Sequence, residues 1–80
     1  MKAQVFVTLK NGVLDPQGEA VSRALKTMGN ANIMSVRQGK FFEIEIAEAD
    51  AEKAKTALMQ MADKLLANTV IENYRVEILK

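Results

Sequence analysis

Apolar residues recur in this chain with two different periods, and the order of these periods limits the folds that it can adopt. Alternation with a period of two, typical of a half-buried strand, runs through 2–10, 40–46 and 74–78. Spacings of three and four residues, typical of an amphipathic helix, run through 16–28 and 51–67. Strands and helices therefore alternate along the chain.

Residues with special backbone preferences mark the ends of both helices. Asp15 is placed to cap the first helix, with Pro16 at its first position, and Gly29 is placed to stop it. Asp50 is placed to cap the second helix, and Asn68 is expected to end it. The apolar stripes expected to face a sheet are Val21, Ala24, Leu25 and Met28 in the first helix and Ala51, Ala54, Leu58, Met61 and Leu65 in the second.

A further run at 33–37 precedes the strand at 40–46, and Gln38-Gly39 lies between them, which predicts a β-hairpin. The complete order is then βαββαβ. The simplest closed solution is an α+β fold of ferredoxin-like type, with a four-stranded antiparallel sheet and two helices on one face.

The second face of this sheet is left without a helix. Its aromatic residues stand among charged ones, a composition that suits a partly polar protein–protein interface better than plain solvent. The residues assigned to this face are Phe6, Arg37, Phe41, Glu43, Glu45, Arg75 and Glu77.

The length of the chain predicts one small domain, residues 1–80, with a thin core. A chain of 80 residues buries only about 60% of the surface that its unfolded form exposes. Domains of this size often add disulfides, metals or oligomerisation. The chain has no cysteine and no histidine, so oligomerisation remains, and we expect a dimer or a larger assembly.

Charge and hydropathy argue against two classes of partner. The net charge of +1 gives only weak attraction to nucleic acid or to a membrane surface. The first residues alternate and contain no long apolar run, so neither a signal peptide nor a membrane span is expected. We therefore expect a cytoplasmic protein that binds neither nucleic acid nor membrane.

The loop Lys10–Gly18 is the densest local pattern. A turn at Gly12, a cap at Asp15 and Pro16 at the first helical position explain three of its residues. Gly18 remains unexplained, because glycine in a helix costs about 1 kcal/mol against alanine. Its presence predicts that something packs closely against this turn. The helix N-terminus also offers N–H groups to an anion, although the Asp15 carboxylate would compete for them.

No set of residues forms a recognisable catalytic centre. Without histidine or cysteine, imidazole and thiolate chemistry are excluded. Gly39-Lys40 lacks the upstream glycine, the following Ser or Thr and the helix of a Walker phosphate loop. Glu43 and Glu45 share a strand face, but on a solvated or interface surface and not in the cleft that acid/base catalysis needs. We expect a non-catalytic chain that binds no metal or cofactor.

Three strings together resemble one known family. They are the loop Lys10–Gly18 with its Leu14-Asp15-Pro16-Gln17-Gly18, the segment Val36–Lys40, and Leu65–Tyr74 with its Leu-Leu-Ala-Asn and Val-Ile-Glu. In combination they resemble the PurS small subunit of phosphoribosylformylglycinamidine synthase, over nearly the whole chain. One departure is Thr69, where the family commonly has proline. Threonine leaves φ freer and restores an N–H donor at this corner.

The resemblance implies a part in purine biosynthesis. The complex is an ATP-dependent ligase that makes formylglycinamidine ribonucleotide from formylglycinamide ribonucleotide, with glutamine as amido donor. In it a glutaminase subunit releases ammonia, and a large synthetase subunit uses ATP and Mg²⁺. The small subunit, a homodimer or tetramer, would bridge the two and support ammonia transfer without catalysis. Whether segments are exchanged between its copies stays open.

The residues expected to contact a partner or to shape the dimer follow from these strings and from the open sheet face. They are Phe6, Lys10, Asn11, Gly12, Asp15, Pro16, Gly18, Arg37, Gly39, Lys40, Phe41, Asn68, Ile71, Glu72 and Tyr74.

Two other functions remain as alternatives. The first is a regulatory domain that holds a small anionic ligand between protomers, with Asn11-Gly12-Val13 and the following helix N-terminus. The second is a nucleic-acid-binding module, which ranks last because the charge is nearly balanced and Phe41 is a lone candidate for base stacking.

Overall fold

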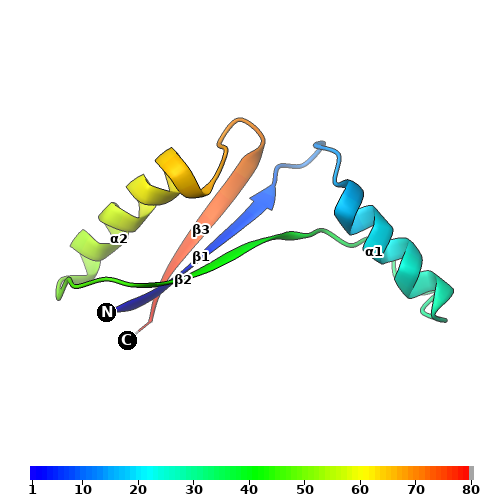
Figure 1. The fold of residues 1–80 in the computed structure, drawn as a ribbon, viewed down its shortest axis with the longest axis horizontal. Coiled ribbons are helices and arrows are strands. Elements are labelled where there is room, and N and C mark those ends of the chain that lie inside the picture. Colours follow the sequence, from blue (N-terminus) through cyan, green and yellow to red (C-terminus); the bar gives the residue numbers. More distant parts are fainter. Residues whose placement is uncertain (80) are drawn as a thin grey trace.

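The structure, a computed structural model, describes residues 1–79. Strands and helices follow each other along the chain as Figure 1 shows, from the blue N-terminus to the red C-terminus. The elements are β1 (Lys2–Leu9), α1 (Pro16–Thr27), β2 (Gly39–Glu45), α2 (Ala51–Met61), a π-helical turn (Ala62–Leu66) that continues α2, and β3 (Glu72–Leu79).

The strands form an antiparallel sheet in the order β2-β1-β3, so β1 is the central strand. On one face, Val5 of β1 lies opposite Phe42 of β2 and Val76 of β3. On the other face, Phe6 lies opposite Phe41 and Arg75 in the same strands. The period-two alternation therefore divides the sheet into an apolar face and a mixed one, as predicted.

The core lies between the apolar sheet face and α2, which packs against β3. Val5, Val7 and Leu58 are the largest fully buried side chains. The buried stripe of α2 runs through Ala54, Leu58 and then Ala62. Burying these side chains contributes the main stabilisation of the domain, about 1.5–3 kcal/mol for each valine or leucine.

The predicted stripe of the second helix is wrong at both ends. Its first member, Ala51, is exposed, and at the C-terminal end the last turn widens. The N–H of Ala67 donates to the carbonyl of Ala62, five residues earlier, at 2.9 Å. The wider turn leaves Leu66 packed against the core cluster, whereas Leu65 is exposed. Met61 is also exposed, since the buried line passes through its neighbour Ala62.

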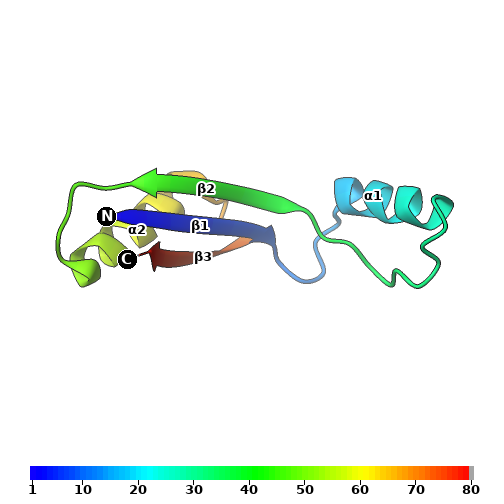
Figure 2. The same cartoon turned by 90° about the horizontal axis from the view of Figure 1, so that it is seen from below.

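Helix α1 lies beyond one end of the sheet, away from α2 (Figures 1 and 2). The described residues span 48 × 27 × 14 Å with a radius of gyration of 15.8 Å. A compact domain of this length would have a radius of about 12 Å. Within residues 1–79, α1 makes no extensive contact with the sheet or with α2. The chain is therefore elongated, with one helix outside its core.

The α+β class and the antiparallel sheet are confirmed, and the arrangement is consistent with a ferredoxin-like fold. The predicted hairpin between 33–37 and 40–46 does not form among the described residues. Residues 33–38 are not in a strand, and they continue away from β2 instead of turning back (Figure 1). Gly39 does not turn the chain, because it pairs with Thr8 as the first residue of β2. Within residues 1–79 the sheet therefore has three strands, and α2 is the only helix that covers its helix-bearing face.

Candidate partner-contact site

Asp15 connects the start of α1 to the segment that leads into β2. Its Oδ1 accepts a hydrogen bond from the N–H of Gly18 at 2.9 Å, as expected of an N-cap. Its Oδ2 accepts one from the N–H of Gln38, also at 2.9 Å. The hydrogen bonds from Gln38 and Gly18 lower the pKa of Asp15, with a smaller contribution from the charge of Arg37. The carboxylate is therefore ionised at neutral pH and is already used as an acceptor. This disfavours the alternative of an anion bound at this helix N-terminus.

Arg37 makes a second connection between the same two segments. Its guanidinium Nη2 donates to the carbonyl of Leu9 at 2.7 Å and to that of Lys10 at 3.1 Å. These carbonyls belong to the last residue of β1 and to the residue that follows it. Arg37 was predicted on the open sheet face, and this prediction is wrong because residues 33–38 are not part of the sheet.

Gly18 is explained by a close approach within the chain. The residue is buried, and a Cβ atom placed on it would lie 2.5 Å from the carbonyl oxygen of Val36 and would also overlap the Asp15 carboxylate. The prediction that something packs closely against this turn is thus confirmed. The packing element is the chain's own segment before β2, and Gly18 needs no partner molecule to explain it.

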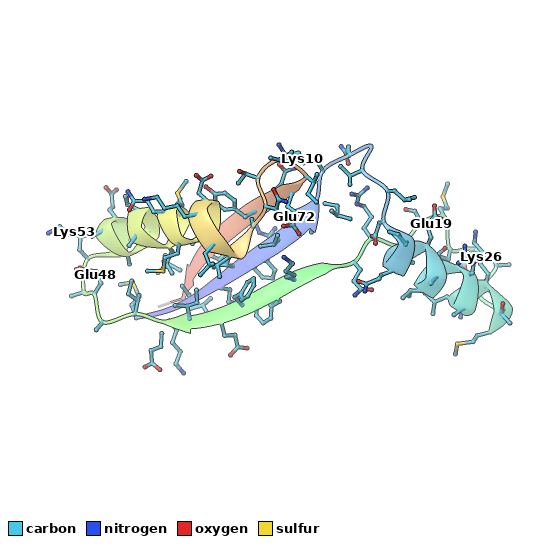
Figure 3. All side chains as sticks on the ribbon, turned by 45° about the horizontal axis from the view of Figure 1, so that its top comes forward. Lys10, Glu19, Lys26, Glu48, Lys53 and Glu72 are labelled. Atoms are coloured by element: carbon cyan, nitrogen blue, oxygen red, sulfur yellow. The ribbon has the colours of Figure 1, made fainter. Side chains whose placement is uncertain are left out.

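The third string of the resemblance joins the other two at the same end of the sheet. The N–H of Lys10 donates to the carbonyl of Ile71 at 2.8 Å. Lys40 Nζ lies 3.5 Å from Glu72 Oε2. Figure 3 shows Lys10 and Glu72 together at this end, with Glu19 and Lys26 farther out on α1. We call this region the three-loop corner, defined by Lys10, Asp15, Arg37, Lys40 and Glu72.

Glu72 holds the corner between α2 and β3. It is buried, and its Oε1 accepts a hydrogen bond from the N–H of Asn68 at 2.7 Å while its Oε2 faces Lys40. Both carboxylate oxygens thus have a partner, as a buried charge requires. Asn68 follows the end of the helix and in turn accepts from the N–H of Val70 through its Oδ1 at 3.2 Å. These contacts close the corner with threonine at position 69, where the resemblance predicted that proline is common.

A groove of about 580 Å³ separates α1 from residues 34–37. Both signs of charge line it, since Arg23, Lys26 and Arg37 stand near Asp15 and Glu19. Residues 1–79 contain no cluster of three acidic residues, histidines or cysteines that could hold a metal ion. No helix in the same range is long and apolar enough to cross a membrane.

The open sheet face carries an ordered aromatic pair. The ring centroids of Phe6 and Phe41 lie 5.1 Å apart, and the guanidinium carbon of Arg75 lies 4.4 Å from the Phe6 centroid. Arg75 Nε is also 3.4 Å from Glu77 Oε1. Apart from Arg37, the residues predicted for this face lie in the predicted alternation.

The predicted contact residues thus separate into groups. Tyr74 belongs to neither surface, because it is half-buried and packs against the core cluster. Phe6 and Phe41 lie on the open face. The others surround the three-loop corner or the loops that enter it: Lys10, Asn11, Gly12, Asp15, Pro16, Gly18, Arg37, Gly39, Lys40, Asn68, Ile71 and Glu72.

Sequence reasoning missed a set of exposed apolar residues around α1. Met28 is 76% exposed and Met34 is 94% exposed, and Leu14 and Val21 also face solvent. Val21, Ala24 and Met28 were expected in the core because the first helix was placed on the sheet, and this prediction is wrong because all three are exposed. The signal that could have found them is quantitative: a domain of this size buries only about 60% of the surface that its unfolded form exposes, so its small sheet has room for few helical side chains.

Nearly the whole chain matches one protein family. Residues 2–80 match the family model described as PurS, phosphoribosylformylglycinamidine (FGAM) synthase. The chain belongs to the PurS family. A Bacillus subtilis relative, phosphoribosylformylglycinamidine synthase subunit PurS, is 47% identical over 77 residues, which are 96% of this chain and 90% of that protein. The corresponding subunit of Synechocystis is 45% identical over 94% of this chain and 75% of its own length.

Solved PurS structures share the elongated fold. The crystal structure of PurS from Methanocaldococcus jannaschii is 42% identical, with a TM-score of 0.87, over 99% of this chain and 95% of that one. A chain in the structure of PurLQS from Thermotoga maritima is 31% identical, with a TM-score of 0.88, over 98% of this chain and 95% of its own. The resemblance that the three strings predicted is confirmed, and with it the prediction that the chain is a subunit of FGAM synthase.

Proposed function

We propose that this chain is the non-catalytic assembly subunit of its FGAM synthase, that it works as a dimer or tetramer, and that it joins a glutaminase subunit to a large synthetase subunit and supports ammonia transfer between them. Family membership over residues 2–80 supports the place in the complex. The observation that carries the assembly role is the exposed apolar side of α1, a helix that makes no extensive contact with the sheet or with α2 within residues 1–79. Such a helix needs another surface to cover it.

A second copy of the chain fits this requirement. β2 is an edge strand, so its outer side is free to accept another strand. Phe42, Ile44 and Ile46 on β2 and just after it are only half-buried. If two copies meet around Gln38-Gly39, residues 33–37 of each can pair with β2 of the other. The hairpin predicted within one chain would then form between two.

This exchange would also restore the missing helix. Helix α1 of the second copy would come to lie beside α2, over Phe42 and Ile44, and Val21, Leu25 and Met28 would enter a shared core. Each sheet would then have four strands and two helices on one face, which is the ferredoxin-like arrangement. Exchange of an element through an extended hinge is a low-cost way to build a dimer.

In this proposal the other subunits carry out the chemistry of the reaction. ATP and Mg²⁺ would bind to the large subunit, and this chain, a single PurS-like domain of residues 1–80, would contribute contacts only. The acceptor groups of the three-loop corner support this division, because Asp15 and Glu72 are already bonded within the chain. The predicted contact residues of this corner would then shape the dimer and the docking surface.

Reconstitution tests the proposal. The chain is mixed with its glutaminase and synthetase partners, and glutamine-dependent FGAM formation is measured together with the mass of the complex by sedimentation. We expect that omission of the chain abolishes glutamine-dependent activity and complex formation, while synthesis from added ammonia by the large subunit continues. If activity and complex mass are the same without the chain, the proposal is wrong.

A further inference from the structure

The sheet face opposite α2 has a regular pattern of rows that the dimer described above does not use. Figure 2 looks onto this face, with α2 behind the sheet. In one row Phe6 lies between Phe41 and Arg75, and in the next Gln4 lies between Glu43 and Glu77. Because the exchange would occupy the helix-bearing face and the outer edge of β2, this face stays available in a dimer.

The centre of this face is apolar and held in place. The tilted pair of Phe6 and Phe41, with centroids 5.1 Å apart, gives a firm aromatic contact. Arg75 stacks over Phe6 at 4.4 Å, and its position is fixed further by Glu77 at 3.4 Å. Phe41 nevertheless remains 50% exposed. A half-exposed aromatic side chain that packs against a second ring has the properties of an interface anchor.

The surroundings of this centre are acidic. Glu43 and Glu45 are exposed on the same face and take part in no ion pair within residues 1–79, whereas Glu77 is paired with Arg75. Among residues 1–79, Lys2 and Arg75 are the cations of this face, so three described carboxylates stand against two positive charges. A partner surface with arginine or lysine side chains around an apolar group would complement it.

A second copy of the same face complements it poorly. In a face-to-face pair related by a two-fold axis parallel to the strands through Phe6, β2 of one copy lies over β3 of the other. Glu43 then opposes Glu77, since both are register partners of Gln4. If the axis instead runs across the strands, Arg75 opposes Arg75. Like charges meet in both arrangements, which costs free energy and disfavours self-association.

We propose that the open sheet face around Phe6, Phe41 and Arg75 is the surface by which this chain docks onto a different subunit of the synthase, and that this subunit presents an apolar or aromatic side chain surrounded by arginine or lysine. The inference rests on the proposed assembly function. It adds which face makes the contact between unlike subunits, and the chemistry of the surface that it meets.

Charge reversal and aromatic truncation test the inference in the full complex. Phe41→Ala removes the exposed anchor, and Glu43→Lys reverses the charge beside it. The matched controls lie on the exposed side of the helical layer, where Leu65→Ala shortens an exposed apolar side chain and Asp63→Lys makes the same charge change. The dimer or tetramer state of each variant alone is measured by sedimentation, and its binding to the two partner subunits by titration at two salt concentrations.

We expect Phe41→Ala and Glu43→Lys each to weaken binding to one partner subunit by about tenfold or more, with no change in the mass of the isolated variant. Binding of Glu43→Lys should also depend less on salt than binding of the unmodified chain. Both controls should bind within about twofold of the unmodified chain, as is common for substitutions outside a hot spot.

The other outcomes separate the two proposals. If the unmodified chain binds no partner subunit, the proposed assembly function fails. If it binds, and both open-face variants bind as tightly with their circular dichroism unchanged, the docking face is wrong while the assembly function stands. If Phe41→Ala instead lowers the mass of the oligomer that the variant forms without its partners, the open face joins copies of this chain and the inference is overturned. Because Glu43 is exposed, Glu43→Lys remains informative even if Phe41→Ala is poorly folded.

Discussion

The two helices of this chain carry similar sequence signals and reach opposite outcomes. Both begin with an aspartate cap, and both have apolar residues at helical spacing. α2 buries Ala54 and Leu58 completely under its own sheet, whereas α1 leaves Val21 and Met28 exposed. The difference lies in the connections: Asn68 and Glu72 turn the chain back after α2, while Asp15 and Arg37 hold α1 beyond the end of the sheet. The sequence of an amphipathic helix thus shows that its apolar side must be buried, but it does not show which chain provides the surface that buries it.

The largest effects are expected from substituting the apolar residues of each helix, because the two helices should then fail in different ways. In α1, Val21→Asp with Leu25→Asp should weaken the dimer at least about 100-fold, or about 3 kcal/mol, because two apolar contacts are lost and two charges are buried. The strand signal in circular dichroism should remain. In α2, Leu58→Asp should unfold the chain at every concentration, since Leu58 has no exposed surface.

Sedimentation equilibrium and circular dichroism over a range of concentrations measure both effects. Ala20→Asp serves as the control in α1, because Ala20 is exposed and lies about 100° around the helix from Val21. A dimer that survives the double substitution in α1 would show that this helix does not hold two copies together.

Gly18→Ala tests how closely the start of α1 packs against the segment before β2. Helix propensity alone favours alanine by about 1 kcal/mol, but a Cβ atom here would lie 2.5 Å from the carbonyl oxygen of Val36. We therefore expect a net loss of about 1–3 kcal/mol, typical of overpacking, measured by thermal unfolding. Ala20→Gly gives the propensity term alone, and a stabilised Gly18→Ala would contradict the close packing between α1 and the segment before β2.

Acid should weaken the Asp15 contacts that attach α1 to the segment before β2. The pKa of Asp15 is lowered in the folded chain, so its contribution to stability is complete above its unfolded value of about 3.9. That contribution is lost as the pH falls through the lower folded value. Amide resonances of Gln38 and Gly18 should shift over this range, and Asp15→Asn should remove the shift. A pH titration followed by NMR measures this shift. If the amide resonances of Gln38 and Gly18 stay constant over the range, the Asp15 carboxylate does not connect the two segments.

Much of the sheet half was predictable because its determinants are local. The alternation of Val5 and Val7 with Phe6 set the faces of β1, and the pairing with β2 and β3 preserved them. The N-caps Asp15 and Asp50 were also predictable from the sequence, since a cap depends on residues two or three positions away. The π-helical turn after α2 was not, because Leu65 and Leu66 are equally apolar and only packing decides which one turns inward.

The candidate site was predictable as a set of strings, but not as an arrangement. The resemblance singled out Lys10–Gly18, Val36–Lys40 and Leu65–Tyr74, which the fold brings to one end of the sheet. It could not tell that Arg37 would bond to the carbonyls of Leu9 and Lys10 and so lie outside the sheet. Contacts between residues 27 or 28 positions apart depend on the path of the whole chain, and no local pattern encodes them.

The short-range pattern of this chain decided its class, the strands β1, β2 and β3, its helix starts and, through three strings, its family. The position of α1 was decided only in three dimensions. Residues 33–37 have the same local sequence whether they fold back on β2 or extend past it, and the free-energy difference depends on what covers Val21, Leu25 and Met28. Within residues 1–79, Val21 and Met28 stay exposed and Leu25 is only half-buried, because the Asp15 and Arg37 contacts keep the segment extended. The physical reason is that burial is a property of the finished assembly, whereas amphipathicity is a property of the sequence.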